Sequence, residues 1–125
     1  MFDVSPDGQF LMSLIDSGDK VGIYQYSLSE RKCNLLLPGV ATFGLLFDRN
    51  GKSFLYAVPS RIDVTIYRQN WQTGKLLGQP QVALKLPFAF PLLFGGNAYD
   101  FARDLSTVVY ARPSGHADLY LLSRK

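Results

Sequence analysis

The sequence is poor in the residues from which cross-links, metal sites and hydrolytic centres are built. It contains one cysteine, Cys33, and one histidine, His116, in 125 residues. A single cysteine cannot form an internal disulfide, and these two side chains alone do not supply the ligands of a metal site. A serine nucleophile would need His116 and a third orienting group, but Ser114 and Asp118 lie too close to it along the chain. The residues therefore predict no catalytic centre, no metal and no cofactor.

Long hydrophobic runs and clusters of one charge are also missing. The most apolar stretch, 86–96, is about half the length of a membrane span and contains two prolines, so we expect no membrane insertion by this segment. The first apolar run is interrupted by Ser5-Pro6-Asp7-Gly8, which is unlike a secretory signal. Thirteen Lys and Arg face ten Asp and Glu, scattered singly or in pairs, which argues against a nucleic-acid-binding surface.

The residue types that are abundant in the chain favour β-strands and tight turns. Hydrophobic residues make up 47% of the chain and aromatic residues 14%, which is typical of a folded protein and excludes disorder. Eleven glycines and seven prolines indicate many tight turns. No stretch of useful length shows the i, i+3, i+4 apolar spacing of a helix. The composition predicts an all-β protein.

The chain repeats itself after 43 residues. Residues 4–32 align with 47–75 without a gap, so that Asp7-Gly8 falls on Asn50-Gly51. A shorter third copy, 101–111, aligns with 47–57. Each copy contains an Asx-Gly-like turn, which we expect to be a two-residue hairpin, and then an apolar strand, a polar loop, an aromatic-rich strand and a polar turn. Three copies of one unit indicate an array.

A four-stranded antiparallel unit with both faces apolar is the blade of a β-propeller. A β-sandwich also spaces its strands closely, but it does not account for ungapped repetition. We therefore expect one partial propeller domain over 1–125, with blades at 1–42, 43–97 and 98–125, the last one incomplete. The expected strands are 2–4, 9–15, 21–28, 33–37, 43–47, 53–58, 63–71, 81–86, 98–102, 106–112 and 117–122. The side chains expected to be buried are Phe10, Met12, Phe54, Tyr56, Val108 and Tyr110, and in large part Tyr24, Tyr67 and Tyr120.

The stretches "VSPDGQFLMSL" (4–14) and "ADLYLL" (117–122) resemble the WD-like repeats of TolB-type propellers. The resemblance covers nearly the whole chain, although only the first copy keeps the full Ser-Pro-Asp-Gly. It implies a segment of a propeller of six to eight blades, formed by its last three. Similar blades form the propeller of prolyl-oligopeptidase-like enzymes and the tail of some membrane-anchored bacterial serine/threonine kinases. In these repeats the Asp-Gly pair is structural.

Several residues are candidates for binding. The apolar connection 86–99 has no counterpart in the first copy, and its aromatic residues, together with the single histidine in a loop, are the candidates for contact with a partner: Phe88, Phe90, Phe94 and His116. Four carboxylates near the inner strands could hold a cation, but turn capping explains them better: Asp3, Asp48, Asp100 and Asp104. Cys33 is expected to be a small packed hydrophobe.

Two functions remain open. The first is a non-catalytic module that binds a protein or peptide, or acts as a scaffold. The alternative is the ancillary propeller of a larger enzyme, a kinase or a peptidase, whose catalytic domain lies outside this chain. The compartment depends on that parent and is either the bacterial periplasm or the cytoplasm. Because the third copy stops before an outer strand, its edge and the outer face of the first blade are left open, and we expect self-association.

Overall fold

The computed structural model describes residues 2–15, 18–40, 44–60, 63–86, 99–114 and 116–123. These residues form strands and one 3-10 turn, Gly18–Lys20. The strands are β1 (Phe2–Val4), β2 (Phe10–Ile15), β3 (Gly22–Ser27), β4 (Lys32–Pro38), β5 (Gly44–Phe47), β6 (Ser53–Pro59), β7 (Val64–Gln72), β8 (Lys75–Leu86), β9 (Tyr99–Phe101), β10 (Thr107–Ser114) and β11 (His116–Ser123). Within the described ranges, no helix is long and apolar enough to cross a membrane.

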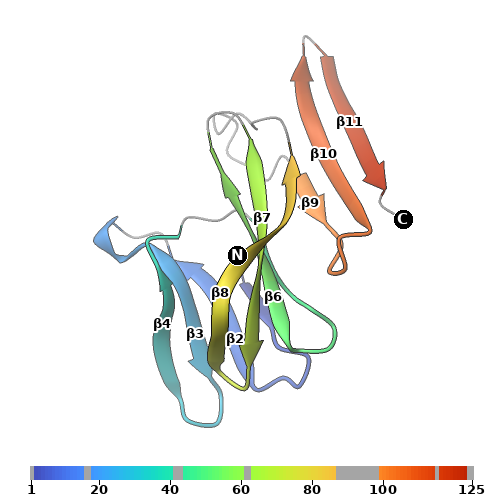
Figure 1. The fold of residues 1–125 in the computed structure, drawn as a ribbon. Helices are drawn as coiled ribbons and strands as arrows, with labels where there is room; N and C mark the ends of the chain where they lie inside the picture. Colours follow the sequence, from blue (N-terminus) through green and yellow to red (C-terminus); the bar gives the residue numbers. More distant parts are fainter. Residues whose placement is uncertain are drawn as a thin grey trace.

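The strands form three antiparallel sheets in chain order (Figure 1). The first has the order β1-β2-β3-β4, the second β5-β6-β7-β8 and the third β9-β10-β11. Each strand pairs with the next along the chain, so each sheet is a meander that its own segment can complete. The all-β prediction is confirmed, and the expected strands agree with the observed ones to within two residues, except at the start of β8.

The exception is the start of β8, which was expected at residue 81 but lies at Lys75. Thr73 and Gly74 both have positive φ, 47° and 87°, and join β7 to β8 as a two-residue hairpin turn. Such turns match the twist of the flanking strands, so pairing begins immediately after Gly74. The segment 75–80 was not recognised as a strand, because Gly78, Gln79 and Pro80 separate Leu76 and Leu77 from the apolar run that follows.

A bulge then restores the register of β8. The pairing jumps from Asn70–Leu77 to Arg68–Gln81, which leaves extra residues of β8 opposite the buried Gln69. The Gln69 amide nitrogen donates to the carbonyls of Asn70 and Gly78, at 2.9 and 3.1 Å. A buried amide thereby satisfies carbonyls that the bulge removes from the ladder.

The connection between β10 and β11 is shorter than the sequence predicted. A polar loop was expected across "RPSGHAD", with His116 in it. Instead, β10 continues to Ser114 and β11 begins at His116. Ser114 pairs with His116, so the histidine begins a strand. Two long paired strands satisfy each other's backbone groups, and this outweighs the polar composition of the segment. In Figure 1 this hairpin extends beyond the other two sheets.

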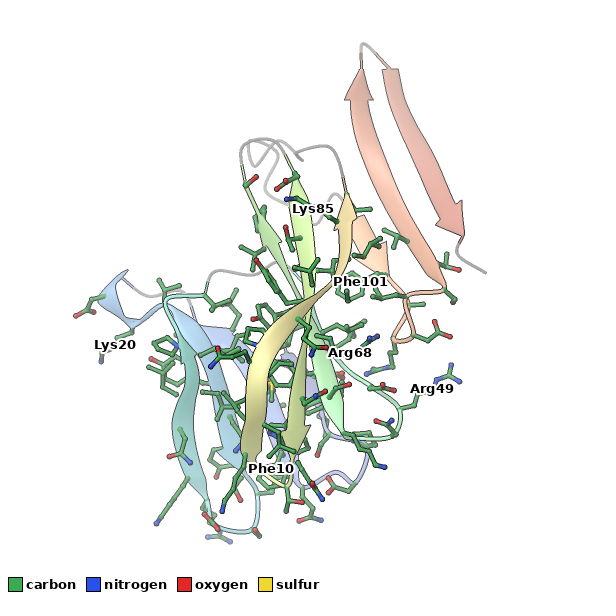
Figure 2. All side chains as sticks on the ribbon, in the orientation of Figure 1. Phe10, Lys20, Arg49, Arg68, Lys85 and Phe101 are labelled. Carbon is green, nitrogen blue, oxygen red and sulfur yellow. The ribbon has the colours of Figure 1, made fainter. Side chains whose placement is uncertain are left out.

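The core lies between the sheets in two clusters. One joins the first and second sheets through Met12, Ile23, Leu45, Phe47, Phe54, Tyr56 and Trp71. The other joins the second and third through Leu55, Ala57, Val64, Ile66, Leu86, Phe101, Leu105 and Val108. Figure 2 shows Phe101 in the interior near β9. The second sheet is therefore apolar on both faces, as the sequence predicted for a blade between neighbours.

The burial predictions are confirmed for Met12, Phe54, Tyr56 and Val108. Phe10 is half-buried, and its ring meets Trp71 edge-on at 5.2 Å between centroids. Tyr67 is half-buried and stacks on Tyr56 at 5.4 Å. Tyr24 is also half-buried; its hydroxyl donates to the backbone carbonyl of Lys20. The side chains of Tyr110 and Tyr120 are not among those that the structure describes, so their predicted burial is not tested.

Candidate functional site

The turn between the first two strands of each sheet has the same hydrogen bonds in all three sheets. A backbone N–H at its start donates across the turn, from Ser5 to Phe10, from Asp48 to Ser53 and from Ala102 to Thr107. Two residues into the turn, a side-chain oxygen accepts from a backbone N–H: Asp7 from Gln9, Asn50 from Lys52 and Asp104 from Ser106. The repeat read from the sequence therefore holds at the level of single hydrogen bonds.

These turns are longer than the expected two-residue hairpin. Four residues separate Ser5 from Phe10, because the Asp7 carboxylate bonds forward to Gln9 and holds the backbone in an Asx turn. The position nevertheless requires a positive φ, which is 73° at Gly8 and 69° at Gly51. The third copy places Leu105 there, at φ 59°, with its side chain buried against the core.

One ion pair connects the three sheets at these turns. The Arg103 guanidinium follows β9 and reaches Asp3 in β1, with Nη1 2.5 Å from Oδ2 and Nη2 3.2 Å from Oδ1. The same Nη1 donates to the carbonyl of Phe47, and the Phe47 N–H donates to Asp3 Oδ2 at 2.8 Å. The first, second and third sheets thus converge on one carboxylate.

This network controls the charge of Asp3. Burial opposes ionisation of the carboxyl group, but hydrogen bonds from Arg103 and from backbone N–H groups outweigh it and lower the pKa of Asp3 below its ordinary value. The hydrogen bond to Asp3 raises the pKa of Arg103 in turn. Both groups are therefore charged at neutral pH, and their pairing is bidentate.

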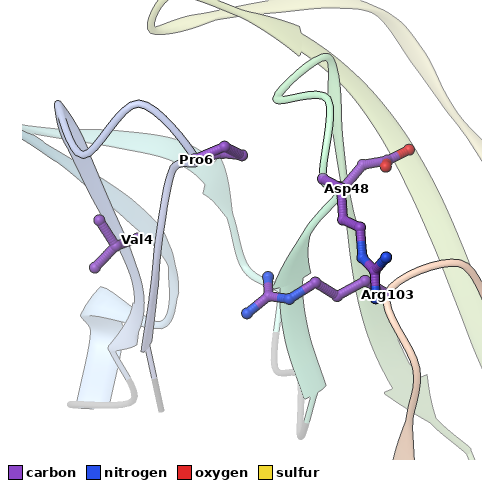
Figure 3. Close-up of a pocket in the computed structure, with 5 residues that line it drawn as sticks. Val4, Pro6, Asp48 and Arg103 are labelled. Carbon is purple, nitrogen blue, oxygen red and sulfur yellow. The ribbon is translucent and has the colours of Figure 1, made fainter.

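Beside this pair lies a hollow of about 250 Å³, lined by Val4, Pro6, Asp48, Arg49 and Arg103 (Figure 3). Its lining comes from all three turns. Pro6, Arg49 and Arg103 occupy the same position of the repeat, each directly before the Asp or Asn that caps its turn. Three of the five residues that line the hollow therefore come from one position of the repeat.

The charged residues of the hollow differ in whether they form hydrogen bonds within the fold. Arg103 bonds to Asp3 and Phe47, and Asp48 accepts from the Ser53 hydroxyl at 3.4 Å. Arg49 is exposed and projects outward from its turn (Figure 2). Its charge contributes to lowering the pKa of Asp104, after the larger effect of hydrogen bonds from Ser106. Arg49 has no hydrogen bond to any described residue, so its guanidinium can donate to a ligand.

Three of the four carboxylates considered as a cation site have other roles in the structure. Asp3 binds Arg103, Asp48 accepts from Ser53 and Asp104 caps its turn. The side chain of Asp100 lies outside the described ones. Within the described residues, no group of three metal-ligating side chains comes together. Turn and ion-pair chemistry, rather than metal binding, accounts for the three that are described.

The partner-contact residues predicted from the sequence are not tested by the structure. Phe88, Phe90 and Phe94 lie outside the described residues. His116 begins β11, and its side chain is not among those described. Cys33 is exposed on β4, which contradicts the prediction of a packed hydrophobe, because β4 is the outer strand of its sheet.

Sequence reasoning missed Arg49 and Arg103. The signal was in the alignment: both precede the Asx residue of their turn, where the first copy has Pro6. Equivalent positions of neighbouring repeats lie close together in an array, so two arginines there predict a shared cationic rim.

Comparison with known proteins agrees with the fold. No protein-family model matches the chain, and no curated protein matches it. Among solved structures, TolB from Acinetobacter baumannii is similar, with a TM-score of 0.60 and 21% sequence identity. The fold is that of TolB-like β-propeller blades. The match covers 98% of this chain but only 29% of the TolB chain, so the chain spans under a third of that protein.

Proposed function

We propose that this chain is a non-catalytic binding segment of a β-propeller, which recognises a protein or peptide at the rim formed by its three equivalent turns. The observation that carries the proposal is Arg49, an exposed guanidinium without a hydrogen-bond partner among the described residues, at the edge of a hollow with an apolar wall. The TolB-like fold, which is generally non-catalytic, supports a binding role. A binding role is also compatible with the alternative, in which the chain is the ancillary propeller of a larger enzyme.

The hollow favours a short peptide segment over a small molecule. It is open to solvent and combines the apolar Val4 and Pro6 with the cationic Arg49 and the anionic Asp48. Mixed apolar and charged contacts over a shallow surface are typical of peptide recognition, whereas small-molecule sites are usually enclosed and mostly apolar. We expect the bound segment to carry a carboxylate next to an apolar residue.

A peptide library displayed on phage and selected against this chain tests the proposal. We expect the selected peptides to be enriched in Asp or Glu, and to lose affinity by about tenfold on the Arg49→Ala variant. Lys52→Ala is the matched control, because Lys52 is an exposed cation on the same turn outside the lining of the hollow. Equal loss on both variants would indicate general charge attraction, and no loss on Arg49→Ala would place recognition elsewhere. Either result contradicts the proposal.

A further inference from the structure

The turn between β5 and β6 contains the only Asn-Gly pair in the sequence, Asn50-Gly51. Asn50 is exposed and Gly51 is partly exposed, so water reaches the side-chain amide. In such a pair the backbone nitrogen of the glycine can attack the side-chain carbon Cγ of the asparagine. Glycine favours this attack, because it has no side chain to obstruct the close approach of its backbone.

The hydrogen bonds of the turn act on both reacting groups of this pair. The backbone N–H of Lys52 donates to Asn50 Oδ1 at 2.8 Å, and the backbone N–H of Gly51 donates to the carbonyl of Asp48 at 3.0 Å. The first bond places a donor where negative charge develops during attack on Cγ, and so it stabilises that charge. The second bond must break before the nitrogen can attack. We therefore expect the reaction to follow local opening of this exposed turn.

We propose that Asn50 is a site of spontaneous deamidation. The Gly51 nitrogen loses its proton and forms a bond to Asn50 Cγ. The bond from Cγ to the amide nitrogen breaks, and this nitrogen takes up a proton and leaves as ammonia, so that a cyclic succinimide remains. Water then opens the ring at either carbonyl and gives aspartate or isoaspartate. Water is the only co-reactant, and the chain gains a negative charge at position 50.

The repeat shows that the turn accepts the aspartate product. Asp7 and Asp104 occupy the position of Asn50 in the other two copies. Each accepts from the backbone N–H two residues further on, as Asn50 does. Aspartate at position 50 therefore keeps the acceptor that holds the turn. Isoaspartate adds a methylene to the main chain, and we expect it to lose this hydrogen bond.

The corresponding residues of the other copies are poor substrates for the same reaction. Asp7 is followed by Gly8, but hydrogen bonds from the Ser5 hydroxyl and from the backbone lower the pKa of Asp7. Its carboxyl group is therefore ionised at neutral pH, and an ionised carboxylate resists attack by a nucleophile. Asp104 is also a carboxylate, and the residue after it is Leu105, whose side chain obstructs the approach. Of the three equivalent turns, the second is the one that reacts.

The new charge lies next to Arg49, the exposed guanidinium at which we propose peptide binding. The turn 48–52 carries the cations Arg49 and Lys52 and the carboxylate Asp48, so a second carboxylate balances its charge. Aspartate at position 50 repels an acidic peptide and competes with it for Arg49. Deamidation therefore weakens binding at this site. This consequence rests on the proposed function, whereas the deamidation itself does not.

Mass spectrometry of the whole chain, incubated at mildly alkaline pH and then digested, tests the modification. Chymotrypsin cleaves after Phe47 and Phe54 and so releases residues 48–54 as one peptide. We expect this peptide to gain the mass difference between an amide and a carboxyl group. Treatment with an isoaspartyl methyltransferase then distinguishes isoaspartate from aspartate.

Two asparagines of the same chain are the matched controls. Asn34 lies in β4 and precedes Leu35, and Asn70 lies in β7 and precedes Trp71. Both have a bulky following residue and a backbone held in a strand. We expect Asn50 to deamidate at least about tenfold faster than either. Equal rates at the three positions would overturn the proposal. So would an unchanged Asn50 after the time in which a synthetic peptide of residues 47–55 is fully deamidated.

The Asn50→Asp variant reproduces the aspartate product and tests the consequence for binding. Acidic peptides selected on the wild-type chain should bind this variant about tenfold more weakly. Asn34→Asp, at an exposed position of β4 outside the lining of the hollow, adds the same charge elsewhere and should leave the affinity unchanged. Unchanged affinity for Asn50→Asp would overturn the effect on binding. A wild-type chain that binds no acidic peptide would refute the proposed function alone, since the mass measurement decides the modification independently.

Discussion

The Trp71 indole donates its N–H to the side-chain oxygen of Gln25, at 2.7 Å, and so joins β7 of the second sheet to β3 of the first. The amide nitrogen of Gln25 donates in turn to the carbonyl of Gly74, at 3.0 Å. Both Gln25 and Trp71 are buried. One amide therefore satisfies a donor and an acceptor from the neighbouring sheet, inside an otherwise apolar contact.

Replacing Gln25 by Met keeps the volume but removes both hydrogen bonds. The Trp71 N–H then stays buried without a partner, so we expect the free energy of unfolding to fall by about 1–3 kcal/mol. Urea unfolding followed by Trp71 fluorescence measures the loss. Gln72→Met, at an exposed position of β7, is the control and should change stability by less than about 0.5 kcal/mol. Equal losses in the two variants would show that the hydrogen bonds contribute nothing specific.

Phe54 is fully enclosed and packs between the rings of Phe47 and Tyr56, with centroids at 6.1 and 6.0 Å. Truncation to Ala should lower the free energy of unfolding by about 3–5 kcal/mol, because it removes a large apolar side chain and leaves a cavity. Thermal or urea unfolding checks the value. Leu77→Ala on the exposed part of β8 provides the comparison. A loss below about 1 kcal/mol for Phe54→Ala would mean that the core rearranges to fill the space.

The ion pair between Asp3 and Arg103 makes stability depend on pH. Because the pKa of Asp3 is lower in the folded chain than its ordinary 3.8, its contribution is fully present above that pH and is lost as pH falls through the folded value. We expect Asp3→Asn to lower stability at neutral pH and to flatten the decline of stability below the ordinary pKa. Urea unfolding at a series of pH values measures both effects. A variant whose stability falls with pH as steeply as the wild type would assign the decline to other carboxylates.

Gly51 tests the backbone requirement of the repeated turn. A Cβ there would lie 3.5 Å from Pro6, an ordinary contact, so the cost of a substitution comes from its φ of 69°. We expect Gly51→Val to cost more than Gly51→Asn, by about 1 kcal/mol, because Asn adopts the left-handed region far more readily. Unfolding free energies of the two variants make the comparison. If they are equal, the turn has changed its conformation.

The Leu105 position offers the reverse experiment. This leucine holds a left-handed backbone at φ 59° while its side chain is buried beside Phe101 and Val108. Leu105→Gly relieves the backbone but removes an enclosed side chain, and the second effect is larger, about 2–5 kcal/mol against 1–2. The variant should therefore be less stable. A gain in stability would show that backbone strain, rather than packing, dominates at this turn.

The sequence by itself determined the repeat, the fold class and most strand boundaries. It could do so because the 43-residue spacing places Asp7-Gly8 on Asn50-Gly51, and the turn chemistry of these residues is local. Apolar runs such as 53–58 also predict a strand that is buried on both faces, and this prediction needs no information from the rest of the chain.

Only the tertiary structure decided which distant residues meet. The pairing of Asp3 with Arg103, the bond from Trp71 to Gln25 and the grouping of Arg49 with Pro6 all depend on how one sheet stacks on the next. Stacking is governed by the sum of many weak apolar contacts, and no short pattern in the chain records it. The bulge in β8 belongs here too, since the buried Gln69 that completes it is identified by its surroundings and not by its neighbours in sequence.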